Sequence, residues 1–186
     1  GTWFAVNHWN VIPDIITMAK GLTSAYAPLG AVAMKAEIAE HFDHRKFVGG
    51  LTYNGHPISL AAALANIEVI QMENLVEHTR SMQLPMMKLL NGLKARHPSV
   101  GDVRGIGLFG AIELIKDKNS HIPLGEYGKT PTILKDLKEL TLSKGLFHYT
   151  HDNLILIIPP LIINDEELEL GFSILDKALT IADATV

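Results

Sequence analysis

The residues whose chemistry stands out first are Lys20 and Gly21, which follow the apolar run Ile15–Met18. A lysine desolvated at the end of an apolar strand loses part of its preference for the ammonium form, because burial disfavours charge. A neutral amine can attack an aldehyde and form a Schiff base, and glycine lets a bulky ligand approach the backbone. The same residues also fit a helix that ends in Lys and is followed by Gly. The segment alone leaves both interpretations open.

A second candidate is the glycine-rich segment 49–52, Gly-Gly-Leu-Thr, which precedes a helix expected to begin near Pro57. Free backbone N–H groups ahead of a helix, together with a threonine hydroxyl, suit a phosphate. An ordinary flexible loop has the same composition. Phosphate binding at Thr52 is therefore one of two interpretations of this segment.

Residues 105–110 match the dinucleotide-binding pattern G-x-G-x-x-G letter for letter. That pattern needs a strand before it and a helix that opens on its last glycine. Here the strand-like segment 111–115 follows the last glycine instead. We therefore interpret these glycines as part of a twisted or bulged strand and expect no dinucleotide site.

Nine histidines raise the question of a metal site. His41 and His44 are three positions apart, as are His148 and His151. On one continuous strand His148 and His151 would face opposite sides, and no third ligand is indicated. We expect no metal site.

Strand-like and helix-like segments alternate along the chain, which predicts an α/β or α+β protein. Pro85 predicts a kink or break inside the second long helix. Asn164 and Glu167 form a capping-box pair before the last helix, whose apolar stripe is Leu168, Phe172, Leu175 and Leu179. The expected strands are 15–18, 31–34, a pair within 100–115, 146–149 and 154–158; the expected helices are 36–42, 58–72, 75–96, one from Pro131 to Lys144, and the last from Asn164.

Composition narrows the class of protein. The 186 residues carry a formal net charge of −4, and 47% of them are hydrophobic, so the chain can build a real core. The negative charge and scattered arginines argue against a nucleic-acid partner. No apolar run is long enough to span a membrane, there is no cysteine, and no signal segment is visible. We expect a cytoplasmic protein.

Taken together, several segments resemble the class III (omega) aminotransferases, which are fold-type I enzymes dependent on pyridoxal 5′-phosphate. Residues 3–8, 13–22 and 26–31 are similar to the family's Schiff-base segment, and residues 51–57 with 61–64 to its phosphate loop and following helix. Residues 103–108 and 159–163 resemble signatures of its C-terminal domain. The similarity covers essentially the whole chain and is closest to the taurine–pyruvate aminotransferase group.

The resemblance implies a role for each candidate residue. Lys20 would hold the cofactor aldehyde as a Schiff base and later move a proton as a general acid–base. Thr52 would bind the cofactor phosphate, in this family usually across the interface of a homodimer. Residues 1–72 would form the C-terminal part of the large cofactor domain with the start of the interdomain helix, and residues 73–186 a small α+β C-terminal domain.

The resemblance also implies that other contacts are missing. Members of the family are much longer, and their N-terminal half carries the first phosphate loop, the aromatic residue on the pyridine ring and the acid that pairs with the pyridinium nitrogen. Asp14 lies too close to Lys20 to be that acid. We therefore expect this chain to be the C-terminal portion of a longer enzyme.

One departure from the family concerns the substrate. Family members often carry an arginine shortly before the Pro-Pro-Leu segment, where it grips the acceptor's carboxylate. This chain has no arginine there, and His151 is the nearest positional match. A protonated histidine can bind a carboxylate or sulfonate, although a surface histidine fits equally well. Arg104 fits a structural ion pair as well as an anion ligand.

The resemblance predicts transamination, in which an amino group moves from an amine or omega-amino acid, taurine-like, to a 2-oxo acid such as pyruvate. The alternative is a catalytically inert fragment of such an enzyme, without the N-terminal cofactor contacts. A lyase or racemase reaction on the same cofactor is a third option.

Overall fold

The computed structural model describes residues 1–186 and divides into two compact units. One unit comprises Thr2–Val76, and the other comprises Glu77–Val186 together with Gly1. Each unit is described separately.

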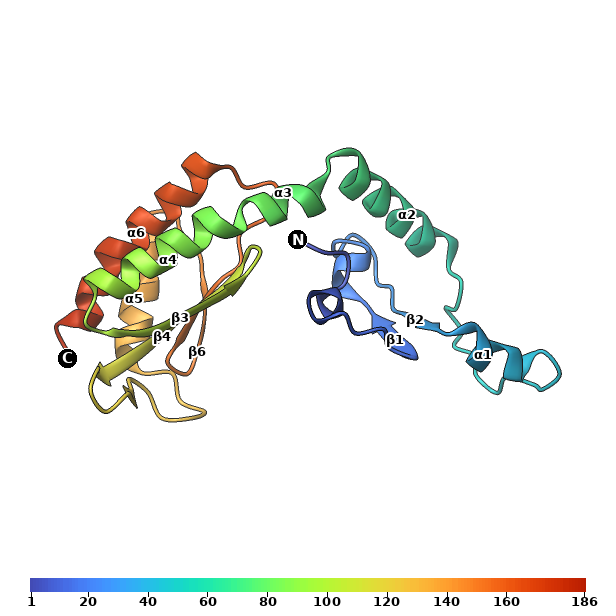
Figure 1. Cartoon of the computed structure of the whole chain (residues 1–186), viewed down its shortest axis with the longest axis horizontal. Helices are drawn as coiled ribbons and strands as arrows, with labels where there is room; N and C mark the ends of the chain where they lie inside the picture. Colours follow the sequence, from blue (N-terminus) through green and yellow to red (C-terminus); the bar gives the residue numbers. More distant parts are fainter. The chain divides into compact units, whose positions relative to one another are not determined.

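The unit Thr2–Val76 is a small set of strands and helices that leads into one long helix. Its two strands, β1 and β2, pair antiparallel from Ile15↔Met34 to Met18↔Ala31. The long helix α2 begins at Pro57, at the position where the missing proline N–H costs no hydrogen bond. In chain order its elements are η1 (Ala5–Trp9), β1 (Ile15–Met18), η2 (Lys20–Leu22), β2 (Ala31–Met34), α1 (Ala36–Ala39), η3 (Glu40–Phe42) and α2 (Pro57–Met72) (Figure 1).

This unit has almost no core of its own. Its fully buried residues are Thr23, Ser59, Ala63 and Leu75. Many of its large apolar side chains are at least 40% exposed instead, among them Trp3, Phe4, Trp9, Val11, Ile12, Ile15, Tyr26, Val32, Phe47, Val48, Leu51 and Tyr53. So much exposed apolar surface is typical of a face that another polypeptide covers.

The unit Glu77–Val186 is built on an antiparallel sheet with the strand order β3-β4-β7-β6, with β5 paired to β4. Along β4 the residues Gly110, Ile112 and Leu114 are buried, and the residues between them are less buried, so one sheet face meets the core. The strands are β3 (Val100–Ile106), β4 (Phe109–Asp117), β5 (Ile122–Pro123), β6 (Tyr149–His151) and β7 (Leu154–Ile157).

Helices supply the other side of this core. Helix α4 (Gln83–Arg96) packs on β3 and lies beside α6 (Asp165–Asp183), and α5 (Thr132–Ser143) packs on α6 (Figure 1). Leu90 of α4, Leu137 of α5 and Leu175 of α6 are each no more than 2% exposed. All four residues of the predicted stripe on the last helix are buried, and its Asn164–Glu167 capping box is present.

The break in the second long helix lies three residues before Pro85, not at it. Helix α3 (Leu75–Ser81) ends before Met82, and α4 begins at Gln83. A proline has no N–H for the carbonyl four residues earlier, and its ring clashes with that carbonyl. For Pro85 that carbonyl belongs to Ser81, where α3 ends.

One strand prediction needs correction, one strand was not predicted, and the interpretation of residues 105–110 as part of a strand agrees with the structure. The strand expected at residues 146–149 is β6 at Tyr149–His151, because the Leu146 backbone N–H still bonds the Thr141 carbonyl at the end of α5 (2.9 Å). Strand β5 was not predicted from the sequence. The glycines of 105–110 lie in the β3–β4 hairpin, where Gly107 has φ +57, so no helix opens on them.

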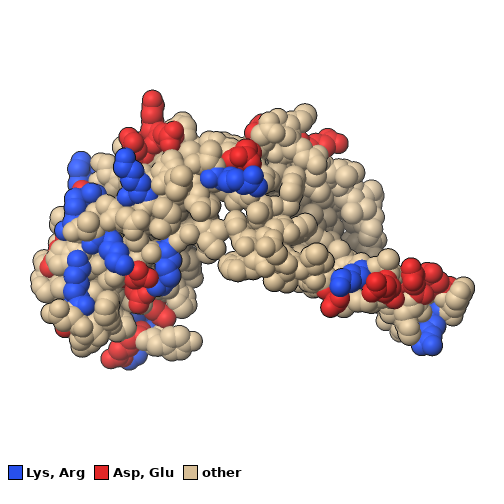
Figure 2. Space-filling model, in the orientation of Figure 1, with Lys and Arg blue, Asp and Glu red and all other residues tan.

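No helix of the chain combines the length and the apolar character needed to cross a membrane. On the face drawn in Figure 2, basic and acidic side chains are intermixed over the unit Glu77–Val186.

Candidate active site

Lys20 lies directly after β1, at the first position of the short helix η2. Its backbone is in the left-handed region (φ +51), which an L-residue adopts only when its surroundings require it. The side chain is exposed and its ammonium has no hydrogen bond or ion pair within the chain. The segment is therefore a strand followed by a strained turn, and the alternative of a helix ending in Lys-Gly is wrong.

The turn at Lys20 is fixed by its neighbours. The Asn66 side chain, on α2, donates to the carbonyls of Gly21 (2.9 Å) and Leu22 (3.3 Å). The hydroxyl of buried Thr23 donates to the Ala27 carbonyl at 2.6 Å. These bonds hold the backbone on the carboxyl side of Lys20 while its amine stays free.

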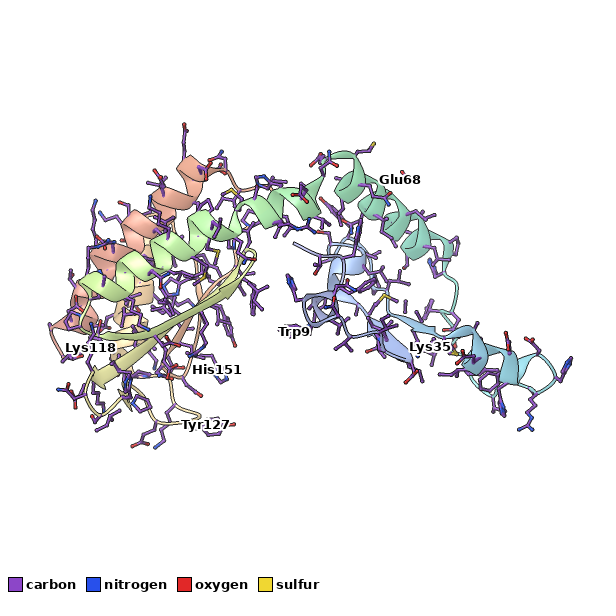
Figure 3. All side chains as sticks on the ribbon, viewed as in Figure 1. Trp9, Lys35, Glu68, Lys118, Tyr127 and His151 are labelled. Atoms are coloured by element: carbon purple, nitrogen blue, oxygen red, sulfur yellow. The ribbon has the colours of Figure 1, made fainter.

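The opposite end of β1 is held by an ion pair. The Lys35 ammonium lies 2.6 Å from the Asp14 carboxylate, and the Lys35 backbone N–H donates to the Asp14 carbonyl at 2.9 Å. The ammonium hydrogen bond lowers the pKa of Asp14. Asp14 is thereby engaged in joining β1 to β2 (Lys35 is labelled in Figure 3).

Thr52 lies in the loop that precedes α2, and its hydroxyl and backbone N–H have no acceptor within the chain. The loop is exposed, and a side chain added at Gly50 or Gly55 would meet no atom within 4 Å. At its end His56 carries a buried Nδ1 that has no hydrogen-bond partner. Unpaired donors and open space beside a helix start are the features that suit a bound anion.

Within one chain, no hydrogen bond or ion pair joins the side chains of Lys20 and Thr52. The Lys20 turn is bonded to Asn66, which is nine residues along α2 from Pro57. At about 1.5 Å per residue, Asn66 lies about 14 Å from the start of that helix. Thr52 precedes that start by five residues, and no hydrogen bond joins its loop to the Lys20 turn.

His151 ends β6, at the hairpin to β7, and its side chain is 58% exposed (Figure 3). Its Nδ1 lies 3.3 Å from the Asp152 carboxylate, which also accepts from the Gly128 backbone N–H at 3.0 Å. A negative ligand at His151 would therefore share the imidazole with an acidic neighbour.

Arg104, the other candidate for an anion, is already paired. Its guanidinium donates to Asp102 and to Glu113, each at 2.8 Å. These bonds, the stronger from Glu113, raise the pKa of Arg104. The structure therefore favours the interpretation of Arg104 as a structural ion pair across β3 and β4.

No group of three or more His, Asp or Glu side chains is placed to hold a metal ion. His148 and His151 differ sharply, since His148 is 5% exposed and lies against the helices. Burial and the nearby Lys138 charge lower the pKa of His148 to about 4, so its ring is neutral at pH 7.

Sequence reasoning missed Asn66, which positions the Lys20 turn. A signal for it exists in the sequence, because Asn66 is a lone amide in a stretch of α2 that is otherwise mainly Ala, Leu and Ile. Its target carbonyls are 44 and 45 positions away. Only the folded chain shows that this amide meets the backbone beyond Lys20.

The chain is similar to known aminotransferases. Over 97% of its length the chain is 35% identical to a taurine–pyruvate aminotransferase of Bilophila wadsworthia, and it covers 41% of that protein. It is 32% identical over its whole length to a putrescine–pyruvate aminotransferase of Pseudomonas aeruginosa and covers 40% of it. The chain thus spans about two fifths of the length of these curated relatives.

Solved structures show the same fold. A taurine:2-oxoglutarate aminotransferase from Bifidobacterium kashiwanohense, in complex with pyridoxal phosphate and glutamate, superposes with a TM-score of 0.92 at 32% identity, covering 97% of this chain and 41% of that one. An S-selective transaminase from Arthrobacter superposes with a TM-score of 0.89 at 32% identity, covering 98% and 41%. The expected α/β fold, part of the fold-type I transferases, is confirmed. Because the family model for class-III aminotransferases matches residues 1–179, the chain belongs to the class-III aminotransferase family.

Proposed function

We propose that this chain serves transamination dependent on pyridoxal 5′-phosphate, with Lys20 as the residue that binds the cofactor aldehyde. The observation that carries the proposal is the free amine of Lys20, held at the end of β1 by a fixed turn. A side chain added at Gly21 would meet nothing within 4 Å, so the space beside the backbone that follows Lys20 is open, and the Lys20 side chain is itself exposed. The residues present therefore fit an aldehyde-bearing cofactor.

Each residue has a defined task in this proposal. Pyridoxal phosphate, when bound, supplies the aldehyde and a ring that withdraws electrons from the substrate carbon. Lys20 Nζ is the nucleophile toward the aldehyde and, once free, carries the proton that leaves the amino donor. Thr52 donates its hydroxyl and backbone N–H to the phosphate. Asn66 positions the Lys20 turn.

We further propose a homodimer in which Thr52 completes the site of the second copy. Support comes from the contacts of the two candidates: the Lys20 turn is bonded to Asn66, nine residues along α2 from Pro57, and no hydrogen bond joins that turn to the loop that carries Thr52. The exposed apolar side chains of the unit Thr2–Val76 offer surface for a partner subunit. Residues 1–72 would then belong to the large cofactor domain, and residues 73–186 to the small one.

The proposed substrates are a taurine-like amine or omega-amino acid as donor and a 2-oxo acid such as pyruvate as acceptor. The relatives that act on taurine or putrescine with pyruvate support this choice. His151 is the proposed ligand for the substrate's acid group. The imidazole would bind that acid group in its protonated form, in competition with the Asp152 carboxylate 3.3 Å away.

Incubation with ¹⁵N-taurine, pyruvate and pyridoxal phosphate tests the reaction. We expect ¹⁵N-alanine, because the amino group of the donor ends on the carbon of the acceptor. His151→Gln should raise the KM for taurine more than that for a donor without an acid group, and His121→Gln, at another exposed histidine, is the control. Equal effects on both donors would contradict the role of His151.

An inert chain is the alternative, favoured by the short span relative to the curated relatives. One experiment distinguishes transamination from an inert chain. If the cofactor binds to Lys20 but no ¹⁵N-alanine forms with taurine, putrescine or other amines, the 186 residues bind cofactor without turnover. Formation of labelled alanine excludes the inert alternative.

A further inference from the structure

A cavity of about 440 Å³ lies within the unit Glu77–Val186, between β6 and β7 on one side and α6 on the other. Its wall is mainly apolar, with Phe147, Leu156, Ile157, Phe172 and Leu175 among its side chains. A cavity of this size, lined by apolar groups with few polar ones, is typical of a small-molecule site. None of the proposed catalytic residues lines it.

One polar side chain in this wall, His148, has ring nitrogens that lack good hydrogen bonds. His148 is 5% exposed, and its buried Nδ1 and Nε2 make no hydrogen bond of good geometry; the Tyr149 backbone is the one hydrogen-bonding group close enough to act on the ring. A neutral imidazole carries one donor and one acceptor. Leaving these nitrogens without good hydrogen bonds costs free energy, and a ligand group that bonded the ring would recover it.

A cation without an ion pair lies beside the same wall. The Lys138 ammonium, on α5, sits 5.1 Å from the centre of the Phe147 ring, and Phe147 lines the cavity. Lys138 is half-buried and has no ion pair with any carboxylate. Its charge is close enough to His148 to lower the histidine pKa. A negatively charged ligand group here could interact with the Lys138 ammonium and accept a hydrogen bond from the His148 ring N–H.

Two other titratable groups line the wall. Glu167, on α6, carries a negative charge, but its carboxylate is held toward the start of the helix, where it accepts from the Asn164 backbone N–H at 3.2 Å as part of the capping box. Tyr149 also lines the cavity and is uncharged at neutral pH. Lys138 is therefore the unpaired charge nearest to His148.

We propose that this cavity binds an apolar monocarboxylate, with its carbon chain among the apolar side chains and its carboxylate between the His148 ring and the Lys138 ammonium. The cavity volume fits the chain, and the two unpaired groups fit the acid. This binding site is separate from the proposed cofactor chemistry at Lys20, and its test does not depend on turnover.

Calorimetric titration of the 186-residue chain with octanoate, 1-octanol and octylamine tests the proposal. Octanoate should bind saturably at one site and more tightly than the alcohol, and octylamine should bind least. Lys138→Gln should weaken octanoate binding about tenfold, since a hydrogen bond to a charged group is worth about 1.5–3 kcal/mol. Lys135→Gln, an exposed lysine on the same helix, is the matched control and should bind as the unaltered chain does.

Nuclear magnetic resonance of the His148 ring gives a second, independent readout. Bound octanoate should raise the pKa of His148 above its value of about 4, because a carboxylate stabilises the imidazolium. His148→Leu should keep the fold and lose the preference for octanoate over octanol. Equal binding of acid and alcohol, no effect of Lys138→Gln, or an unchanged His148 titration would each overturn the proposal.

Discussion

At the scale of single residues, the unusual feature is Lys20. Its backbone is fixed in a left-handed conformation, and its amine has no hydrogen-bond or ion-pair partner. Its left-handed φ of +51 costs about 1–3 kcal/mol in a residue other than glycine. Packing and hydrogen bonds from Asn66 and Thr23 maintain it. Strain of this kind gathers at functional sites, which agrees with the role proposed for Lys20.

Asn66→Ala should slow cofactor attachment at Lys20 several-fold, because the turn loses both side-chain hydrogen bonds to its carbonyls. The measurement is the rate of the absorbance change after pyridoxal phosphate is added. Gln71→Ala, at an exposed position of the same helix, is the control. An unchanged rate in Asn66→Ala would show that the turn holds without this residue.

Thr52→Ala should weaken binding of pyridoxal phosphate about tenfold and leave binding of pyridoxal unchanged, because only the former has the phosphate that Thr52 would bond. Equilibrium titration with both compounds measures the difference. Thr52→Ser keeps the hydroxyl and should restore affinity. If both compounds lose affinity equally in Thr52→Ala, the phosphate is not what Thr52 binds.

At the scale of elements, the sequence predicts the helices and most strands, and in the unit Glu77–Val186 it does so because their apolar periodicity matches the buried faces. Strands β1 and β2 and the cap of α6 lie where the pattern places them. The errors lie at boundaries, where one hydrogen bond or one short strand pairing decides. Leu146 stays tied to the end of α5, and the two-residue β5 owes its place to its pairing with β4.

The candidate site was less predictable than the elements. Local residues and the resemblance single out Lys20, but its left-handed backbone and the partner Asn66 depend on contacts over more than 40 positions. The sequence could not predict the state of the His148 nitrogens either, because only the folded chain shows which donors and acceptors lie near the ring.

The core formed by α4 predicts a sharp contrast between two leucines of that helix. Leu90 is fully buried, whereas Leu84 is 78% exposed. Leu90→Ala should lower the free energy of unfolding by about 2–5 kcal/mol, through lost burial and the cavity left behind, and Leu84→Ala should lower it by less than about 0.5 kcal/mol. Urea denaturation of both variants measures this. Similar losses would contradict the described core.

At the scale of the whole molecule, the free energy of unfolding should change with pH in two separate pH ranges. The pKa of His148 is 6.5 when unfolded and about 4 when folded, so the unfolded chain binds the extra proton between these values and stability falls as the pH is lowered. The difference corresponds to about 3 kcal/mol at roughly 1.4 kcal/mol per pKa unit.

The second window lies below the ordinary aspartate pKa. Partial burial opposes ionisation of Asp183, but hydrogen bonds from Ser99 and His97 outweigh it and lower its pKa. That stabilisation is present above about pH 4 and is lost as the pH falls through the folded pKa. Denaturation curves at several pH values should show the upper window disappear in His148→Leu and persist in His44→Gln. A loss of stability between pH 6.5 and 4 that His148→Leu leaves intact would contradict this assignment.

The central claim is that the Lys20 amine binds the aldehyde of pyridoxal phosphate. Its most direct test is reduction of the cofactor-loaded chain with borohydride, followed by mass spectrometry of its peptides, with Lys20→Arg and the exposed Lys46→Arg as matched variants. We predict the pyridoxyl group on Lys20, unchanged in Lys46→Arg and absent from Lys20→Arg. A label spread over surface lysines, or retained in Lys20→Arg, would contradict the claim.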